Sequence, residues 1–424
     1  MASPTTTSPE IGYVNGHGKD WQLWDESEQV PELQWPDAIE VYRRMARGDA
    51  RVASVLKAIR LPIQSAGWRI DPNGARREVV EFIAQNLALP IEGDGPVPKT
   101  RTKGRFSWKL HVQQALLMLQ YGHSFFEQVY RIDDNDRTWL HKLAPRPQRT
   151  ISKISVELDG GLHSIEQSPP SSPLAGFGTT TVKPIPVSAL VAYVNDPEAG
   201  DWLGSSLLRP AYKHWILKDE FMRVQAGTAK RNGMGIPVGT AASDTDGAEV
   251  TKMKDLASGL RGGMASGVGL ARGQDLKLLG VSGNLPDMQQ AIEYQDKSIA
   301  LAALAHFLNL DKGGSYSLAS VLNDTFDQSV QAVAEALCDT ANAHVVEDLV
   351  DLNFGPDEPA PLIMFDEIGS RQDATAASMA LLRNAGLLDD DDMVKIAVRQ
   401  SLRIPLKQND TDDEQSSPTE GDDA

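Results

Sequence analysis

The stretch GSSLLRPAYKHWILKDEFMRVQAGTAKRNG, residues 204–233, decides the fold because it predicts one unusually long helix. Its apolar residues recur at helical spacing, at positions 207, 208, 211, 215, 221, 222 and 224. Pro210 stands in the predicted first turn, where a missing N–H costs little. At 1.5 Å per residue such a helix extends about 40 Å. The segment therefore predicts a long helix that runs out of the preceding domain.

Two further long helices are predicted after it. Residues 234–283 form a glycine-rich insert with a short helical pattern and two strand-like runs, GIPVGT and LKLLGV, which predicts a small α/β unit. The second long helix begins at Pro286 and ends with LAHFLNL, and the third runs from Ser317 to the Gly355-Pro356 pair. The predicted order is therefore a helix out, an insert, a helix back, a glycine loop and a longer helix.

The first 200 residues predict a mixed domain of the α+β class. Helical periodicity covers residues 39–63, with an expected end near Pro62, and residues 77–87. A third helix is expected over residues 107–120, and HSFFEQVYRI, residues 123–132, is typical of a strand. Short strands separated by Gly, Ser and Pro turns are expected as far as residue 200.

Both ends of the chain lack such patterns. Residues 1–30 are rich in Ser, Thr and Gly with little periodicity, which predicts a flexible arm. Residues 410–424 contain seven acids and no Lys or Arg, which predicts a solvated tail.

Composition limits the possible partners. The chain has 424 residues and a formal net charge of −17, which argues against a general basic surface that wraps nucleic acid. Any nucleic-acid contact is therefore expected to be local or weak.

Cys338 is the only cysteine, so an intrachain disulfide and a thiolate zinc cluster are excluded. No apolar run approaches the roughly 20 residues of a membrane span and MASPTTTSPEIG lacks signal-peptide features, so a soluble protein without membrane contact is expected.

The glycine loop LNLDKGGSYSLAS, residues 308–320, resembles a phosphate-binding loop only in composition. A nucleotide-binding P-loop needs GxxxxGK[ST] after a strand, whereas Lys312-Gly313-Gly314-Ser315 has the reverse order and follows a predicted helix. Gly18-Lys19 is followed by Asp20 in the predicted flexible arm. The sequence therefore predicts no nucleotide cofactor.

Metal-dependent catalysis is not indicated either. The eight histidines include no HExxH pattern, and His111, His123, His141 and His344 are expected to be packed or surface residues. The acidic runs at residues 133–136 and 389–392 are more simply a turn and a helix start. No catalytic residue, metal or cofactor is predicted, and the chain is not expected to be an enzyme.

Four stretches carry a resemblance to a known family: LPIQSAGWRIDP (61–72), YGHSFFEQVYRI (121–132), LAPRPQRTI (143–151) and residues 204–239. In this order along the chain they resemble the portal proteins of tailed bacteriophages, especially the Mu-like and related portals. The resemblance extends over residues 35–405.

The resemblance implies a portal fold with a mixed α/β wing, a long-helix stem, a small α/β clip and a short helical crown. The segments it implies are a flexible N-terminal arm (1–34), the first part of the wing (35–203), a stem helix (204–233), the clip (234–284), the second stem helix (285–309), a tunnel loop (310–317), a long wing helix with a return strand (318–370), the crown (371–405) and a disordered acidic tail (406–424).

It also implies a function. Portal subunits of this kind form a ring, here expected to be a homododecamer, around a double-stranded DNA channel at one capsid vertex. The implied roles are genome packaging with the large terminase subunit, DNA retention and ejection, and attachment of head-tail connector or adaptor proteins. The implied partners also include major capsid and scaffold proteins. Assembly is expected in the host cytoplasm and the final location in the virion.

The implied channel residues lie in the tunnel loop, at Lys312, Gly313, Gly314, Ser315 and Tyr316. The lysine would contact phosphates without reading bases. The alternative is an ordinary helix–helix turn with a solvated lysine.

The stem helix offers a second set of candidates, Lys213, Lys218, Arg223, Lys230 and Arg231. They either face DNA or pair with acids of the adjacent stem helix, Asp287, Glu293 and Asp296, and pairing is the favoured interpretation. Trp215, Phe221 and Met222 are expected to pack between helices. Two other classes stay open, a metal-dependent DNA-processing enzyme and a different ring-forming connector.

Overall fold

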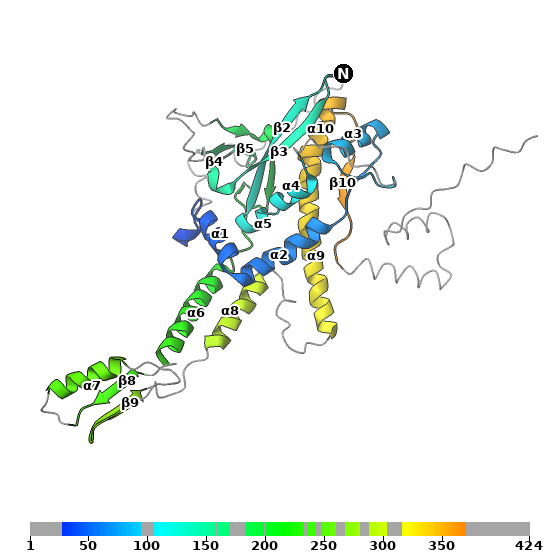
Figure 1. Cartoon of the computed structure of the whole chain (residues 1–424). Coiled ribbons are helices and arrows are strands. Elements are labelled where there is room, and N and C mark those ends of the chain that lie inside the picture. Colours follow the sequence, from blue (N-terminus) through cyan, green and yellow to red (C-terminus); the bar gives the residue numbers. More distant parts are fainter. Residues whose placement is uncertain are drawn as a thin grey trace, which may run out of the picture.

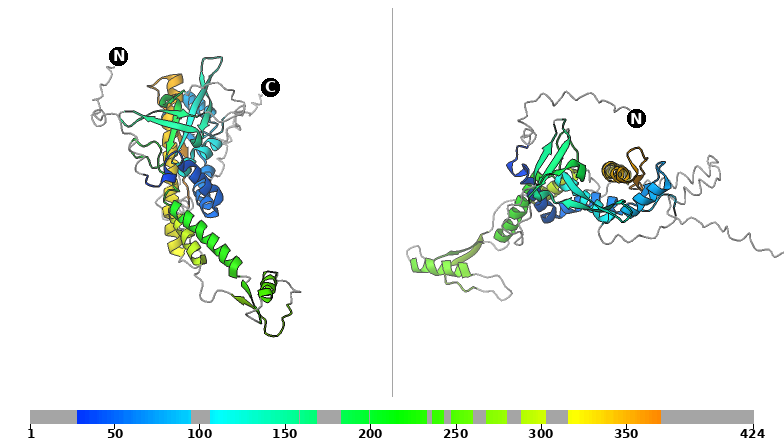
Figure 2. Two further views of the ribbon diagram at one scale, coloured as in Figure 1. Left: turned by 90° about the vertical axis from the view of Figure 1, so that its left-hand side faces the viewer. Right: turned by 90° about the horizontal axis from the view of Figure 1, so that it is seen from above.

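The computed structural model describes residues 28–94, 106–157, 159–168, 183–198, 200–232, 236–242, 247–259, 268–279, 288–302 and 316–369. A body of helices and sheets carries two helices that project from it, α6 (Tyr212–Asn232) and α8 (Met288–Ala302), here called the stalk (Figure 1). A small unit, here called the tip, lies at the far end of the stalk. The views of Figure 2 agree that the stalk points away from the body.

One strand of the body joins two hydrophobic cores. β2 (His123–Ile132) is central in an antiparallel sheet of order β3-β2-β7, between β3 (Thr138–Arg146) and β7 (Leu190–Val194). Successive residues of a strand point to opposite faces. Phe126 accordingly packs into the largest core and its neighbour Phe125 into a separate one.

Two smaller antiparallel sheets complete the body. One has the order β4-β5-β6 and the other pairs β1 with β10. Their strands are β4 (Ile151–Val156), β5 (Leu162–Gln167), β6 (Ile185–Pro186), β1 (Trp68–Asp71) and β10 (Leu362–Phe365). The β1–β10 pair brings residues almost 300 positions apart in sequence into one register, with Trp68 opposite Phe365.

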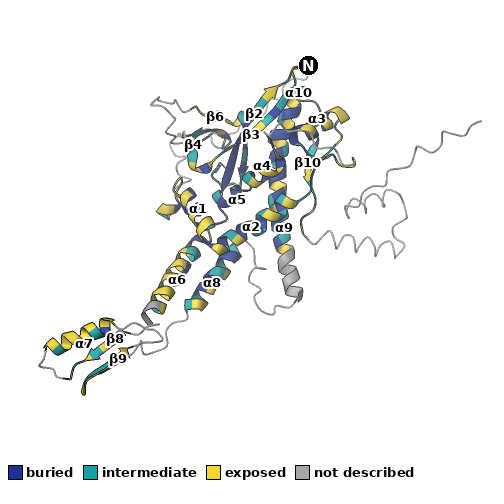
Figure 3. Cartoon of the chain, in the orientation of Figure 1, coloured by how far each residue is buried: buried dark blue, intermediate teal, exposed yellow. Residues whose placement is uncertain are grey.

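Seven described helices belong to the body, and all but the first contribute buried residues to the largest core. They are α1 (Ala38–Gly48), α2 (Ala50–Ser65), α3 (Arg77–Leu87), α4 (Trp108–Ala115), α5 (Met118–Tyr121), α9 (Tyr316–Ala341) and α10 (Glu347–Phe354), with short 3-10 turns at Pro31–Leu33, Gln148–Thr150 and Val187–Ala189. Figure 3 shows that buried residues concentrate in the body, whereas the stalk and the tip are mostly exposed or half-buried.

A π-helical segment, Asn342–Val346, joins α9 to α10. Together they run from Tyr316 to Phe354, which confirms the long helix predicted from Ser317 to the Gly355-Pro356 pair. The wider turn sets the Asn342 side chain against the edge of β10. Its Oδ1 accepts a hydrogen bond from the Ile363 N–H at 2.7 Å, and its Nδ2 donates to the Ile363 carbonyl at 3.3 Å. These two hydrogen bonds join the long helix to the sheet through the backbone of Ile363.

The single helix expected over residues 39–63 is wrong, because it breaks at Asp49. This residue has an extended backbone and caps α2, where its Oδ1 accepts hydrogen bonds from the Arg51 and Val52 N–H groups at 2.8 and 3.1 Å. Pro62 lies inside α2, which continues to Ser65. Burial of the helix face on both sides of Pro62 outweighs the backbone hydrogen bond that proline cannot donate.

Two other boundaries differ from expectation. The helix expected over residues 107–120 is divided into α4 and α5 at Leu116–Leu117. The first long helix begins at Tyr212, so Pro210 stands in the turn before it.

The tip has the α/β composition expected of the insert. Antiparallel strands β8 (Ile236–Thr240) and β9 (Asp275–Leu279) pair in register, and α7 (Gly247–Gly259) packs on β8. Met253 of α7 is buried and touches the position of Gly239, where a Cβ atom would meet the Met253 carbonyl oxygen at 2.8 Å. Glycine at this position therefore allows helix and strand to approach closely.

Residues 28–34, placed in the flexible arm by the sequence, pack on the body. Glu28 pairs with Arg209 at 2.5 Å, and Glu32 accepts a hydrogen bond from the Tyr212 hydroxyl at 2.7 Å. Leu33 is buried. The predicted crown, most of the tunnel loop and the acidic tail lie outside the described residues.

Candidate functional site at the root of the stalk

The two stalk helices lie side by side and run in opposite directions. His214 near the start of α6 bonds Gln295 near the end of α8 at 2.7 Å, and Gln225 further out bonds Gln289 at 3.4 Å. The sequence predicted this arrangement of a helix out and a helix back.

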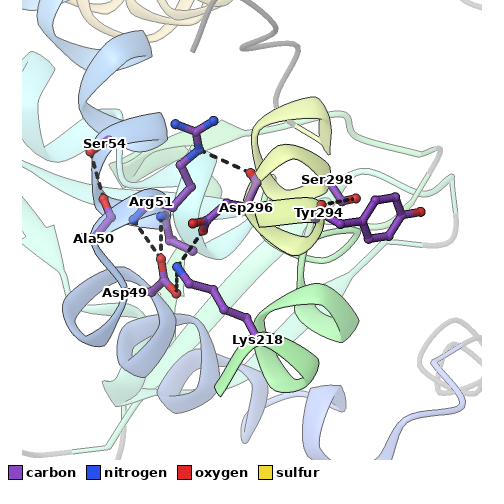
Figure 4. A network of polar contacts seen from close by, with 9 residues as sticks. Asp49, Ala50, Arg51, Ser54, Lys218, Tyr294, Asp296 and Ser298 are labelled. Atoms are coloured by element: carbon purple, nitrogen blue, oxygen red, sulfur yellow. Dashed lines mark hydrogen bonds and ion pairs between the residues drawn. The ribbon is translucent and has the colours of Figure 1, made fainter. Parts of the chain in front are cut away.

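Lys218 is buried at the root of the stalk, with 8% of its surface exposed. Its Nζ lies 2.8 Å from Asp49 Oδ2 at the start of α2 and 2.7 Å from Asp296 Oδ1 on α8 (Figure 4). The Arg51 Nε–H donates to the Asp296 carbonyl at 3.2 Å. Three helices are thus joined through one ammonium group, here called the Lys218 junction.

The electrostatics of the junction keep Lys218 charged. Burial by itself lowers the pKa of Lys218, but the hydrogen bonds to Asp296 and Asp49 and their charges outweigh burial and raise it. The same two carboxylates occupy the ammonium group. Pairing with Asp296, the interpretation favoured from sequence, is confirmed for this residue.

The remaining stalk candidates differ from one another. Arg223 pairs at 2.8 Å with Asp219 of its own helix, instead of with an acid of α8. Lys213 is exposed and forms no ion pair with any described residue. The side chains of Lys230 and Arg231 lie outside the description, although both residues belong to α6.

Among the tunnel-loop candidates, Tyr316 is the first residue of α9, and residues 312–315 lie outside the described residues. Asp49 is the contribution to the Lys218 junction that sequence reasoning missed. The sequence does contain a local sign of this helix start, because Asp49 stands between Gly48, which ends one helix, and Ala50, which begins the next.

The outer surface of the stalk is unusually apolar for exposed helices. On α6 the exposed apolar residues include Met222, which is 49% exposed, and on α8 Tyr294 is 63% exposed. The others on the stalk are Ile216, Leu217, Val224 and Leu301. Trp215 packs against the body, whereas 49% of the surface of Met222 is exposed within one chain, so its expected packing between helices stays a prediction.

The buried histidines are structural. His111 lies in the largest core with its Nε2 at 2.8 Å from the Tyr193 hydroxyl, and burial lowers its pKa to about 3. His123 bonds the Leu203 carbonyl at 2.9 Å, and burial lowers its pKa to about 4.

Within the parts of the chain that the structure describes, no three His, Cys, Asp or Glu side chains form a group able to hold a metal ion. Over the same residues, none of the helices has the length and apolar character needed to cross a membrane.

Chains of a gene transfer agent particle have a similar fold. A chain of the virion of a native gene transfer agent particle is 11% identical with a TM-score of 0.59, and the match covers 85% of this chain and 93% of that chain. A chain from the neck of the native particle, computed with C12 symmetry, is 11% identical with a TM-score of 0.58 over 86% of this chain and 93% of that one. These matches show the fold.

A portal protein of the HK97 phage family from Corynebacterium diphtheriae also matches, at 14% identity and a TM-score of 0.43, over 77% of this chain and 95% of that one. The family is given by the sequence itself. Residues 39–403 match the model of the portal protein of Mu bacteriophage, and the chain belongs to that family.

Proposed function

We propose that this chain is the subunit of a ring that surrounds a channel for double-stranded DNA at one vertex of a phage capsid. The family match over residues 39–403 carries the proposal, because it spans the body, the stalk and the tip together. The similar neck structure with C12 symmetry supports a ring of twelve subunits. The ring would serve genome packaging with the large terminase subunit, DNA retention and ejection, and attachment of head-tail connector proteins.

In this ring the body is the wing, the stalk is the stem and the tip is the clip that meets the terminase and later the connector. The stalk supports this assignment. Two helices alone cannot bury both of their faces, and six large apolar residues of the stalk stay exposed. Neighbouring stalks packed side by side in a ring would cover them.

The glycine loop between α8 and α9 is assigned to the narrowest part of the channel. Lys312, repeated around the ring, would form a band of positive charge that contacts phosphates without reading sequence. The acidic remainder of the chain, with a net charge of −17, would keep the total affinity low enough for DNA to slide. Lys312→Ala is expected to leave the ring intact and to change the length of packaged DNA or its retention. Unchanged genome length and infectivity would remove the loop from this role.

The ring itself is tested by native mass spectrometry and negative-stain images of the purified chain, and of the chain co-produced with its capsid and scaffold proteins. The expected result is a ring with a central hole and the twelve-fold symmetry of the similar neck. A monomer or dimer under both conditions would overturn the proposal, and cleavage of DNA by that species with added metal would favour a DNA-processing enzyme.

A further inference from the structure

A cavity of about 410 Å³ lies against β7, which is an edge strand of the β2 sheet. Ala192 and Val194 of β7 line it, and both pack towards the small core that contains Phe125. Thr340 and His344 line it as well, although α9 packs on the opposite face of the sheet, where the largest core lies. The cavity therefore reaches both faces of the sheet beyond its last strand. It is here called the β7 groove.

The backbone of β7 is unpaired along this groove. In an antiparallel pair, alternate residues direct their N–H and C=O groups to the partner strand, and the others direct them away from it. The Asn195 N–H donates to the Gly122 carbonyl at 2.8 Å, so the odd-numbered residues of this stretch face β2. The N–H and C=O groups of Ala192 and Val194 therefore face outward, and no described residue bonds them. The groove thus offers the hydrogen-bonding groups of an open sheet edge.

The loop beside the groove is acidic. Glu198 and Asp201, which follow β7, both line the cavity. Glu198 is exposed, and its carboxylate has no hydrogen bond or ion pair with any described residue. One oxygen of Asp201 accepts a hydrogen bond from the Leu203 N–H at 2.8 Å, and the other has no described partner. An occupant of the groove is therefore expected to carry positive charge.

One stretch of the chain has the matching pattern. Residues 95–105, GPVPKTRTKGR, lie outside the described residues and are here called the basic segment. They contain four cations and no acid, in a chain with a net charge of −17. Alternate residues of an extended strand point to the same face, and threonine favours strands. The cations stand at every second position, with threonine between the first three, at Lys99, Arg101, Lys103 and Arg105.

We propose that residues 99–103 of a second copy of the chain occupy the β7 groove as an added strand. The backbone of the added strand bonds the outward-facing groups of Ala192 and Val194. Its cations meet the carboxylates of Glu198 and Asp201. The contact joins two copies of the chain, so the inference rests on the proposed ring.

The basic segment and the β7 groove belong to opposite edges of the β2 sheet. The segment follows Asp94, which forms an ion pair of 2.6 Å with α3. α3 packs at the β3 edge, where Asn86 Oδ1 accepts a hydrogen bond from the Leu140 N–H at 2.9 Å, and β7 is the other edge. In a ring built head to tail, each contact joins one side of a subunit to the opposite side of the next.

A contact within one chain is disfavoured by length. The eleven residues of the basic segment extend at most about 36 Å. They would have to reach the far edge of the sheet, follow it, and return to Phe106 in the largest core. The segment of a second copy approaches the groove without this constraint.

The first experiment treats the full chain with a carbodiimide, which joins carboxylates directly to lysine amines. Isotope-labelled and unlabelled chains are mixed before assembly. Amide bonds from Lys99 or Lys103 to Glu198 or Asp201 are expected between chains of different isotope class, and peptide mass spectrometry identifies them. Crosslinks confined to one isotope class would overturn the proposal. The absence of these crosslinks from a sample whose negative-stain images show rings would overturn it as well, while leaving the proposed ring intact.

The second experiment tests the groove without a ring. Replacing the four cations of the basic segment by alanine in the full chain leaves the groove free. A fluorescent peptide of residues 97–105 is expected to bind this chain, and Glu198→Gln is expected to weaken binding roughly tenfold. Asp134→Asn is the matched control, because Asp134 is an exposed acid in the turn between β2 and β3. Equal losses in the two variants would mean that the peptide responds only to net charge, and the proposal fails.

The added strand itself is tested by Ala192→Pro. The Ala192 N–H faces away from β2, so proline at this edge position removes a donor to the peptide and no bond of the sheet. Peptide binding should be lost while thermal unfolding shows that the variant remains folded. In the chain with alanine at position 192, the bound peptide should slow hydrogen exchange of the Ala192 and Val194 amides. Binding without this protection would show that no strand is added.

Duplex DNA is the competing ligand of the basic segment. Replacement of its four cations by alanine is expected to leave the affinity of the full chain for a short DNA duplex unchanged. If the replacement weakens DNA binding and the segment forms no crosslink to Glu198 or Asp201, the segment contacts nucleic acid and the proposal fails.

Discussion

The body and the stalk are stabilised in different ways. The body encloses its largest core between α2, α3, α9 and the β2 sheet, and Phe126 and Val330 in that core have no exposed surface. In α6, by contrast, every residue from Asp219 to Ala229 is exposed or half-buried. The body therefore contains the interior that its own folding needs, whereas the stalk depends on the Lys218 junction at its root and on surfaces that other molecules can cover.

The largest expected effect separates the two regions directly. Phe126 packs edge-on against His111 at 4.5 Å between ring centroids, so Phe126→Ala leaves a cavity in the core. We expect a loss of about 3–5 kcal/mol in the free energy of unfolding. Met222→Ala, on the exposed stalk, is expected to cost less than about 0.5 kcal/mol in the monomer. Urea unfolding of both variants measures the difference, and equal losses would show that the stalk has an interior of its own.

Met222→Ala also tests the proposed ring. If neighbouring stalks cover this side chain, the variant should assemble at a higher protein concentration than the unmodified chain while its monomer stability is unchanged. Assembly at the same concentration would leave Met222 outside the subunit contact.

The second expected effect lies at the junction between the two regions. Lys218→Met keeps a side chain of similar length but leaves Asp49 and Asp296 without the ammonium group that joins them. The expected loss is on the order of 3 kcal/mol. Hydrogen exchange should show faster opening of the backbone of α6 near its start than of α9 in the core.

A double replacement sharpens this result. Adding Asp49→Asn to Lys218→Met removes one of the unpaired charges, and asparagine can still cap α2. Partial recovery of stability is expected, and Lys213→Met on the exposed side of α6 serves as the control that should change little. No recovery would mean that packing of the Lys218 side chain, and not charge, holds the junction.

Features set by local sequence patterns were predicted correctly, whereas features set by contacts distant in sequence were not. The sequence predicted both ends of α3 and of β2 correctly, because the helical periodicity and the strand pattern lie within each segment. The break at Asp49 and the continuation of α2 through Pro62 depend on contacts distant in sequence. Burial of Lys218 depends on two carboxylates that lie 169 positions before it and 78 positions after it, so no pattern within α6 could show it.

The third expected effect is a loss of folding stability at low pH, caused by two histidines that are buried in the body. His111 and His123 are buried with pKa values lowered to about 3 and about 4, against 6.5 for the unburied group. His111 Nδ1 and His123 Nε2 have no hydrogen-bond partner among the described residues, so a proton there would be buried without an acceptor. Above pH 6.5 neither the folded nor the unfolded chain protonates these rings.

Below that pH the unfolded chain takes up protons that the folded chain does not. Stability is therefore lost as the pH falls from about 6.5 toward 4, by about 1.4 kcal/mol per pH unit for each histidine. Urea unfolding at pH 7.5 and 5.5 measures the change. His111→Gln should reduce stability at pH 7.5 but also weaken the pH dependence, and an unchanged dependence would assign it to carboxylates instead.

The smallest expected effect returns to the stalk. Arg223 and Asp219 form an ion pair within α6 with 79% and 56% of their side chains exposed, so water and salt screen the attraction. Arg223→Ala is expected to change the free energy of unfolding by less than about 0.5 kcal/mol, and the change should vanish at high salt. This ion pair has the same length as the contact between Lys218 and Asp49, 2.8 Å, but it is exposed, lies within one helix and has one carboxylate where the junction has two. A loss as large as that of Lys218→Met would therefore mean that exposure does not explain the contrast between the stalk and its root.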